Sequence, residues 1–172
     1  MSAESAPVAL AKESLRYFMA NNQPLPLPSG PIPPELERPA GVFVSLKKNG
    51  QLRGCIGTIL PTQPSAAKEI IRNAVSAAVE DPRFPRVTES ELAELEISVD
   101  ILGTPERIDS ITKLDPKNYG VIVQLGSRSG VLLPDLEGVD SAAYQVEIAC
   151  HKAGINPMEK FTLYRFQVIR HK

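Results

Sequence analysis

Hydrophobic and polar residues alternate without a break from Leu95 to Ile101. Such alternation predicts a half-buried β-strand, most naturally in an antiparallel or mixed sheet. Apolar runs also flank Asn49 and Gly50, a pair that favours a two-residue hairpin turn because both residues tolerate positive φ. The remaining predicted strands are residues 119–125 and 131–133, joined by the loop 126–130, and residues 162–168.

Three other segments repeat their apolar residues at spacings of three and four, which predicts helices at residues 6–19, 62–80 and 140–153. In the second helix Thr62 is the predicted N-cap. Glu69 and Asn73 fall on its polar side, away from a stripe rich in alanine. In the third helix Cys150 falls in the apolar stripe, so we expect a core residue, and Gly154 ends the helix.

Residues 21–40 form a proline-rich segment that is unsuited to a long helix. One interpretation is an ordered strap on the surface, anchored by the apolar side chains of Leu25, Leu27, Ile32 and Leu36. The alternative is a ligand for proline-binding modules, because two of the prolines have a PxxP spacing. We favour the strap, since short PxxP matches are common by chance.

The length of 172 residues suits one domain, with or without a small lobe, and we expect a single domain over residues 1–172. The net charge of −1, from 19 basic and 20 acidic residues, argues against a sequence-independent nucleic-acid binder. No apolar run is long enough to span a membrane, and the first residues lack the features of a secretory signal. Two cysteines make no disulfide framework. We therefore expect a cytoplasmic protein without a membrane anchor.

The hairpin turn sets the pairing of its two strands. A tight turn pairs Leu46 with Arg53 and Val44 with Cys55. Because cross-strand partners share a face, this register predicts Arg53 and Cys55 on one face with the valine and leucine. A β-bulge near Gly54 would change that register.

Cys55 is the candidate nucleophile of the chain. A thiolate is the reactive form of cysteine, and Arg53 would favour it by lowering the thiol pKa. Glu80 or Asp81 would serve as the base, since the sequence does not bring either histidine to the hairpin. The alternative is a buried structural cysteine, because unbridged cysteines are among the most buried residues.

Other residues suggest a binding site. Arg53, Arg83 and Arg128 together would suit an anionic ligand. The alternative, which we favour, is that Arg83 forms a structural ion pair with Asp81 or Glu80, and that Arg128 is solvated. Two glycines of the hairpin indicate a close approach of a ligand or of the backbone. The predicted ligand-binding residues are Gly54, Gly57, Glu80, Asp81, Arg83 and Phe84.

We expect no metal and no cofactor. The chain has no Cys-x-x-Cys pair, and a cysteine next to a histidine, as at Cys150 and His151, is not a usual ligand spacing. The glycine-rich loop 126–130 lacks the lysine and the following helix of a phosphate-binding loop.

Five short segments occur in a characteristic order: Gly-Val-Phe-Val-Ser-Leu at 41–46, Leu-Arg-Gly-Cys-Ile-Gly at 52–57, Asp-Pro-Arg-Phe-Pro at 81–85, a segment 121–134 that ends Gly-Val-Leu-Leu-Pro, and Lys-Ala-Gly at 152–154. The combination resembles the AMMECR domain family, called AmmeMemoRadiSam system protein A in prokaryotes. The resemblance covers nearly the whole chain. One departure is Arg86, which stands where we expect a second proline in many members.

The resemblance implies an α+β fold, in which an antiparallel or mixed β-sheet is flanked by helices and accompanied by a smaller second lobe. It implies a cleft near the Arg-Gly-Cys stretch and, by gene context, a Memo-like partner and a radical S-adenosylmethionine partner. We therefore predict an accessory or ligand-binding protein with a cleft at Arg53, Cys55 and residues 81–84. The alternative function is a thiol-dependent enzyme that uses Cys55 as its nucleophile.

Overall fold

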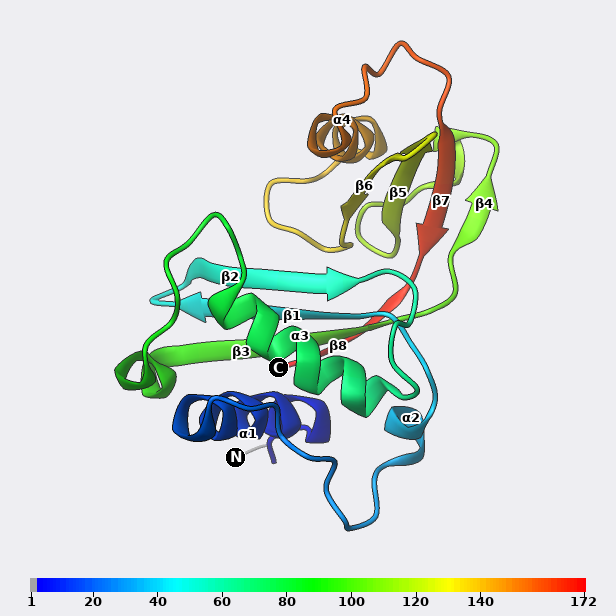
Figure 1. Cartoon of the computed structure of the whole chain (residues 1–172). Coiled ribbons are helices and arrows are strands. Elements are labelled where there is room, and N and C mark those ends of the chain that lie inside the picture. Colours follow the sequence, from blue (N-terminus) through cyan, green and yellow to red (C-terminus); the bar gives the residue numbers. More distant parts are fainter. Residues whose placement is uncertain (1–2) are drawn as a thin grey trace. The chain divides into compact units, whose positions relative to one another are not determined.

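The computed structural model describes residues 3–172 (Figure 1). It contains two compact units. Unit 1 consists of the chain up to Leu102 together with Ile169–Lys172, and unit 2 consists of Gly103–Val168. The described residues form two antiparallel four-stranded sheets, one for each unit, with helices beside them. The predicted α+β class is therefore confirmed.

Unit 1 is built on a sheet with the strand order β2-β1-β3-β8. Helix α3 packs against β1 and β2, and helix α1 packs against α3 and β3. Figure 1 shows both helices beside this sheet. The elements of unit 1 are α1 (Ala6–Asn21), α2 (Pro34–Glu37), β1 (Val42–Lys48), β2 (Gln51–Thr58), α3 (Ala66–Val79), the 3₁₀ helix η1 (Glu89–Glu94), β3 (Leu95–Leu102) and β8 (Val168–His171).

The core of unit 1 lies between this sheet and its helices. Alternate side chains of β1 point into it, and Val42, Val44 and Leu46 are completely buried. Opposite them, Ile70 and Ala74 of α3 are also completely buried. The small alanines of α3 let the helix approach the sheet closely, as their abundance in the sequence indicates.

Helix α3 begins later than the sequence predicts. Its N-cap is Ser65, whose hydroxyl accepts a hydrogen bond from the Lys68 N–H at 3.3 Å. Thr62 is not the cap, because its N–H and hydroxyl both donate to the carboxylate of Glu69, at 2.9 and 2.7 Å. Glu69 is completely buried, so its predicted place on a solvent-facing side is wrong.

The proline-rich segment runs from α1 to β1. Leu25 and Ile32 pack against the core of unit 1, and Leu36 is buried within the short helix α2. Leu27 differs from the other three apolar side chains, because it is 36% exposed. The segment thus has three apolar anchors where the sequence suggests four.

Unit 2 is built on a sheet with the order β4-β7-β5-β6, against which α4 packs through β5 and β6. Cys150 of α4 is completely buried, as its place in the apolar stripe predicts. The elements of unit 2 are β4 (Glu106–Ile108), the 3₁₀ helix η2 (Ile111–Lys113), β5 (Gly120–Leu125), β6 (Arg128–Leu132), α4 (Ala142–Ala153) and β7 (Thr162–Phe166).

Two strand predictions in this region are corrected. Leu125 pairs with Arg128, so the loop of the second hairpin has two residues rather than five. Gly126 has a φ of 61°, which such a tight turn requires. The predicted strand 162–168 is divided at Gln167 into β7, in the sheet of unit 2, and β8, in the sheet of unit 1.

Candidate functional site

The first hairpin contains a β-bulge at Arg53. Lys47 pairs with Leu52, but Leu46 pairs with Gly54, so Arg53 is an extra residue in β2. The uninterrupted register that pairs Leu46 with Arg53 is therefore wrong, and the alternative of a bulge near Gly54 is confirmed. The extra residue moves every later residue of β2 to the opposite face.

This shift gives Cys55 a new partner. Cys55 pairs with Ser45 rather than Val44, and its sulfur lies 3.2 Å from the Ser45 hydroxyl oxygen. Val44 and Leu46 point into the core instead. The thiol of Cys55 is half-buried and lies on the other side of the sheet, beside a polar side chain.

The two glycines of the motif make room for the protein itself. A Cβ atom at Gly54 would overlap the carbonyl oxygen of Ala77 in α3. A Cβ atom at Gly57 would overlap the ring of Phe43, its partner on β1. Close packing of a helix and of an aromatic ring therefore explains both glycines, and this packing fills the space at each Cβ position.

Strand β2 lies at the edge of its sheet, and side chains cap this edge at Cys55. The carboxylate of Asp81 accepts the Cys55 N–H at 3.0 Å, and the guanidinium of Arg83 donates to the Cys55 carbonyl at 3.4 Å. The same two side chains bind each other at 2.8 and 3.0 Å. The favoured ion pair between Asp81 and Arg83 is thus present, and it substitutes for a neighbouring strand at this position.

The electrostatics of this ion pair are asymmetric. The hydrogen bonds from Arg83 lower the pKa of Asp81 to about 2, against the opposing effect of burial. The Asp81 side chain is 2% exposed, whereas that of Arg83 is 52% exposed. The guanidinium carbon also lies 5.3 Å from the centroid of the Phe84 ring. The cation is therefore accessible while its counter-ion is not.

Arg53 is bound to an acid that the sequence analysis missed. Its Nε and Nη2 atoms donate to the two carboxylate oxygens of Glu91, each at 3.1 Å, and Nη1 donates to the carbonyl of Pro85 at 2.8 Å. The two hydrogen bonds from Arg53 to Glu91, with one from the Thr88 N–H, lower the pKa of Glu91 to about 2. The guanidinium of Arg53 thus ties β2 to the segment that follows Asp81. The pattern Thr-x-x-Glu of a capping box is the signal that marks residues 88–91.

The three arginines that suggested an anion site are each paired with a carboxylate: Arg53 with Glu91, Arg83 with Asp81, and Arg128 with Glu159. Arg128 also donates to the carbonyl of Gly154 at 2.7 Å, so the prediction of a simply solvated side chain is wrong. These pairs leave less positive charge for a bound anion than the count of arginines suggests.

The remaining predicted residues separate. Glu80 is exposed and lines a groove along α3 rather than joining Asp81 at the Cys55 backbone. Cys55, Asp81, Arg83 and Phe84 come together at the edge of β2. No cluster of three or more metal-ligating side chains (His, Cys, Asp or Glu) is present in residues 3–172. In that same range, no helix is long and apolar enough to cross a membrane.

These features define a class of α+β proteins with an edge strand that carries Leu-Arg-Gly-Cys-Ile-Gly, capped by Asp-Pro-Arg-Phe-Pro. The family model AMMECR1 matches residues 8–171. The chain belongs to the AMMECR1 family, which confirms the family resemblance seen in its motifs.

Relatives and a solved structure support this assignment. A Thermotoga maritima protein is 53% identical over 148 residues, which are 84% of this chain and 85% of that protein. The Clostridium acetobutylicum protein CA_C1420 is 47% identical over 96% of this chain, but the chain spans only 35% of its length. The crystal structure of the uncharacterized protein PH0010 from Pyrococcus horikoshii is similar, with a TM-score of 0.89 and 32% identity. The match covers 95% of this chain and 88% of that protein.

Proposed function

We propose that this AMMECR1-family protein is a cytoplasmic accessory protein that receives a segment of a partner protein at the edge of β2. The observation that carries the proposal is the half-exposed guanidinium of Arg83, held in place by the buried carboxylate of Asp81 and stacked on Phe84. A fixed, accessible cation beside an aromatic ring suits the recognition of a carboxylate or of a backbone carbonyl.

The proposed partners are a Memo-like protein and a radical S-adenosylmethionine protein, as the family resemblance implies. Neither Cys55 nor Cys150 forms a disulfide, which is consistent with a reducing compartment. An alternative ligand for the same edge is a small anion bound by the guanidinium of Arg83.

The test measures binding of the purified Memo-like and radical S-adenosylmethionine proteins of the same organism by biolayer interferometry. Arg83→Lys keeps the positive charge but removes the planar guanidinium with its paired N–H donors and its stacking on Phe84. We expect this variant to weaken binding about tenfold or more. Arg86→Lys is the matched control, because Arg86 is an exposed neighbour and its side chain forms no ion pair within residues 3–172. If neither partner binds the wild-type protein at micromolar concentrations, the proposal is wrong. Equal loss in both variants would place the contact elsewhere.

A second candidate function is thiol chemistry at Cys55. The observation that favours it is the position of Arg83, whose guanidinium donates to the Cys55 carbonyl at 3.4 Å. Its pKa is raised mainly by the hydrogen bonds to Asp81, and to a smaller extent by the charge of Cys55. Both arginines are paired with carboxylates, Arg53 with Glu91 and Arg83 with Asp81, but it is Arg83 that contacts the Cys55 backbone. In this reading Arg83 stabilises the thiolate and Ser45 orients the sulfur.

Alkylation with iodoacetamide at a series of pH values, read by mass spectrometry, tests this second function. We expect Cys55 to react much faster than Cys150, with a midpoint below the ordinary thiol value of about 8.5. Cys150 is the internal reference, because burial raises its pKa. Equally slow labelling of both thiols in the folded protein would rule out a reactive Cys55.

A further inference from the structure

The two units repeat one arrangement of elements. In each, two strands form a hairpin with a two-residue turn, a helix follows and packs against that hairpin, and a third strand pairs with the first. The three strands have the order β2-β1-β3 in unit 1 and β6-β5-β7 in unit 2, and neighbouring strands are antiparallel in both. Contacts found in both units belong to this shared arrangement, whereas features found in unit 1 alone need another explanation.

The helix approaches the hairpin in the same way in both units. A Cβ atom at Gly54 of β2 would overlap the carbonyl oxygen of Ala77 in α3, and a Cβ atom at Gly130 of β6 would overlap that of Ala149 in α4. The partner of each glycine on the first strand is completely buried. The two hairpins therefore pack on their helices at equivalent positions.

An arginine near this glycine binds the segment that follows the helix in each unit. Arg128 of β6 donates to the carbonyl of Gly154 at 2.7 Å and to the carboxylate of Glu159 at 3.2 Å. Arg53 of β2 binds the corresponding segment of unit 1 with four hydrogen bonds, to two backbone carbonyls and to both carboxylate oxygens of Glu91. The side chain of Arg53 is 14% exposed and that of Arg128 is 44% exposed, so water competes less for the contacts of Arg53. The connection is present in both units, but it is more extensive in unit 1.

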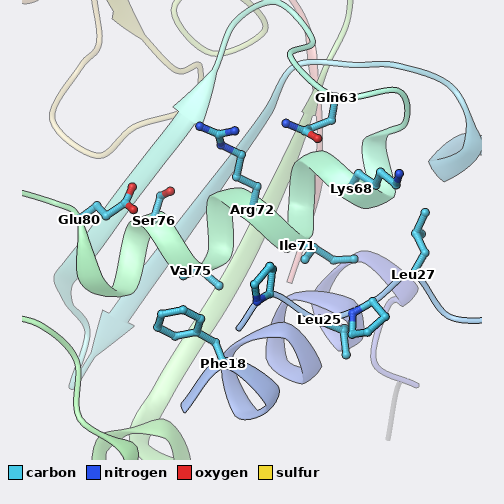
Figure 2. Close-up of a pocket in the computed structure, with 12 residues that line it drawn as sticks. Phe18, Leu25, Leu27, Gln63, Lys68, Ile71, Arg72, Val75, Ser76 and Glu80 are labelled. Carbon is cyan, nitrogen blue, oxygen red and sulfur yellow. The ribbon is translucent and has the colours of Figure 1, made fainter. Parts of the chain in front are cut away.

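Two features belong to unit 1 alone. Strands β5 and β6 pair without a register shift, so the shared arrangement folds without an extra residue such as Arg53. The segment between the helix and the third strand covers residues 80–94 in unit 1 and the shorter range 154–161 in unit 2. In unit 1 it begins at Glu80, which lies at the end of α3 on the opposite side of that helix from Phe18 (Figure 2). The bulge and the length of this segment are therefore not required by the shared arrangement.

The long segment of unit 1 is held against β2 at two places. At Cys55, the backbone of the strand binds two side chains of the segment. At Arg53, the guanidinium donates to the carbonyls of residues 85 and 86, at 2.8 and 3.3 Å. Arg83 and Phe84, the residues proposed to meet a partner, directly precede the second place. Loss of the guanidinium would release the backbone that follows them.

We propose that Arg53 is the positioning residue of the site at the edge of β2: its guanidinium fixes the backbone after Phe84 and so holds Arg83 in place. Arg53 itself does not bind the partner, because the two carbonyls and Glu91 engage its guanidinium. The bulge lets this arginine leave the strand ladder while the residues after it keep their partners on β1. The importance of this positioning for binding rests on the function proposed for the edge of β2, but the positioning itself is measured without a partner.

Relaxation of the backbone amides, measured by NMR on the free protein, tests the positioning. Arg53→Met removes the guanidinium but keeps a long side chain and the extra residue. We expect the order parameters of Arg83 and Phe84 to fall from about 0.85, the value of a rigid backbone, to about 0.6 or below. Arg53→Lys keeps a positive charge near Glu91 but lacks the planar guanidinium, so we expect it to resemble Arg53→Met. Arg128→Met removes the equivalent connection in unit 2 and should leave both order parameters unchanged.

Binding of the proposed partners, measured by the interferometry assay described above, is the second readout. We expect Arg53→Met to weaken binding about tenfold, whereas Arg128→Met should bind as the wild type does. If the wild-type protein binds neither partner, the proposed function is wrong, and the relaxation measurement still decides whether Arg53 positions Arg83.

Three results would overturn the proposal. The first is an unchanged order parameter at Arg83 and Phe84 in Arg53→Met, even with a lower melting temperature, because Arg53 would then contribute to stability alone. The second is wild-type order in Arg53→Lys, which would mean that a positive charge suffices. The third is an equal loss of order in Arg128→Met. If Arg53→Met does not fold, Arg53→Lys decides the test.

Discussion

Asp81 is expected to make the stability of unit 1 depend on acidic pH. Its pKa falls from an ordinary value of 3.8 to about 2 in the folded protein. A folded pKa below the unfolded one stabilises the protein fully above about pH 4, and this stabilisation is lost as pH falls through 2. A lowering from 3.8 to about 2 corresponds to about 2.4 kcal/mol. We expect about 1–2 kcal/mol, because solvent partly screens the half-exposed Arg83.

The assay is urea unfolding between pH 2 and pH 7, followed by far-UV circular dichroism. Asp81→Asn removes the charge but keeps an oxygen that accepts the Cys55 N–H. The difference in the free energy of unfolding between wild type and Asp81→Asn should therefore shrink by about 1–2 kcal/mol as pH falls from 6 to 2. Glu80→Gln, an exposed neighbour, is the control and should show a much smaller pH-dependent difference. A difference that stays constant across this range would refute the reasoning.

Three further predictions concern stability, each measured by urea unfolding. Gly54→Ala should cost about 1–3 kcal/mol, because the new methyl group overlaps the Ala77 carbonyl, whereas Gly30→Ala, which has open space, should be near neutral. Equal costs would contradict this packing argument. Glu69→Gln should cost about 1–3 kcal/mol, because the amide group brings a donor where four donors already converge. A neutral effect would mean that these donors find water. Glu91→Gln should lose its difference from wild type as pH falls from about 4.5 to 2, since the folded pKa is about 2. A gap that persists at pH 2 would show that the carboxylate charge is not its source.

The elements with a regular period are the part of the fold that could be predicted from the sequence. The helix that contains Cys150 follows its hydrophobic period, and so does the strand at Leu95 as far as Val99. Beyond that point Asp100 is buried on the side predicted to be polar. The period could not reveal the bulge at Arg53, since one extra residue exchanges the faces without changing the composition. Gly54, next to the bulge, indicated an irregularity in this part of the strand, but the sequence did not show that Arg53 is the extra residue.

Buried polar groups were the least predictable part. Glu69 reads as a surface residue in a helix, but its buried carboxylate accepts four hydrogen bonds, one from Thr58 at the end of β2 and three from Thr62 and Gln63 in the turn before α3. The pair of Asp81 and Arg83 is local and was found from the sequence. Its contact with Cys55 joins residues 26 positions apart, and the ion pair of Arg53 with Glu91 joins residues 38 apart. Such pairings depend on the tertiary fold and leave no local signal.

Strand β8 gives the order of synthesis a role in assembly. The chain leaves the sheet of unit 1 after Leu102 and returns to it only at Val168, where β8 takes its place beside β3. A ribosome therefore completes all of unit 2 before the fourth strand of the first sheet exists. Until then β3 has an unpaired edge, and Asp100 lacks Arg170, its partner at 2.8 Å. A growing chain at this stage is most exposed to wrong strand pairing, and the length of the interval is set by how fast the residues of unit 2 are synthesised.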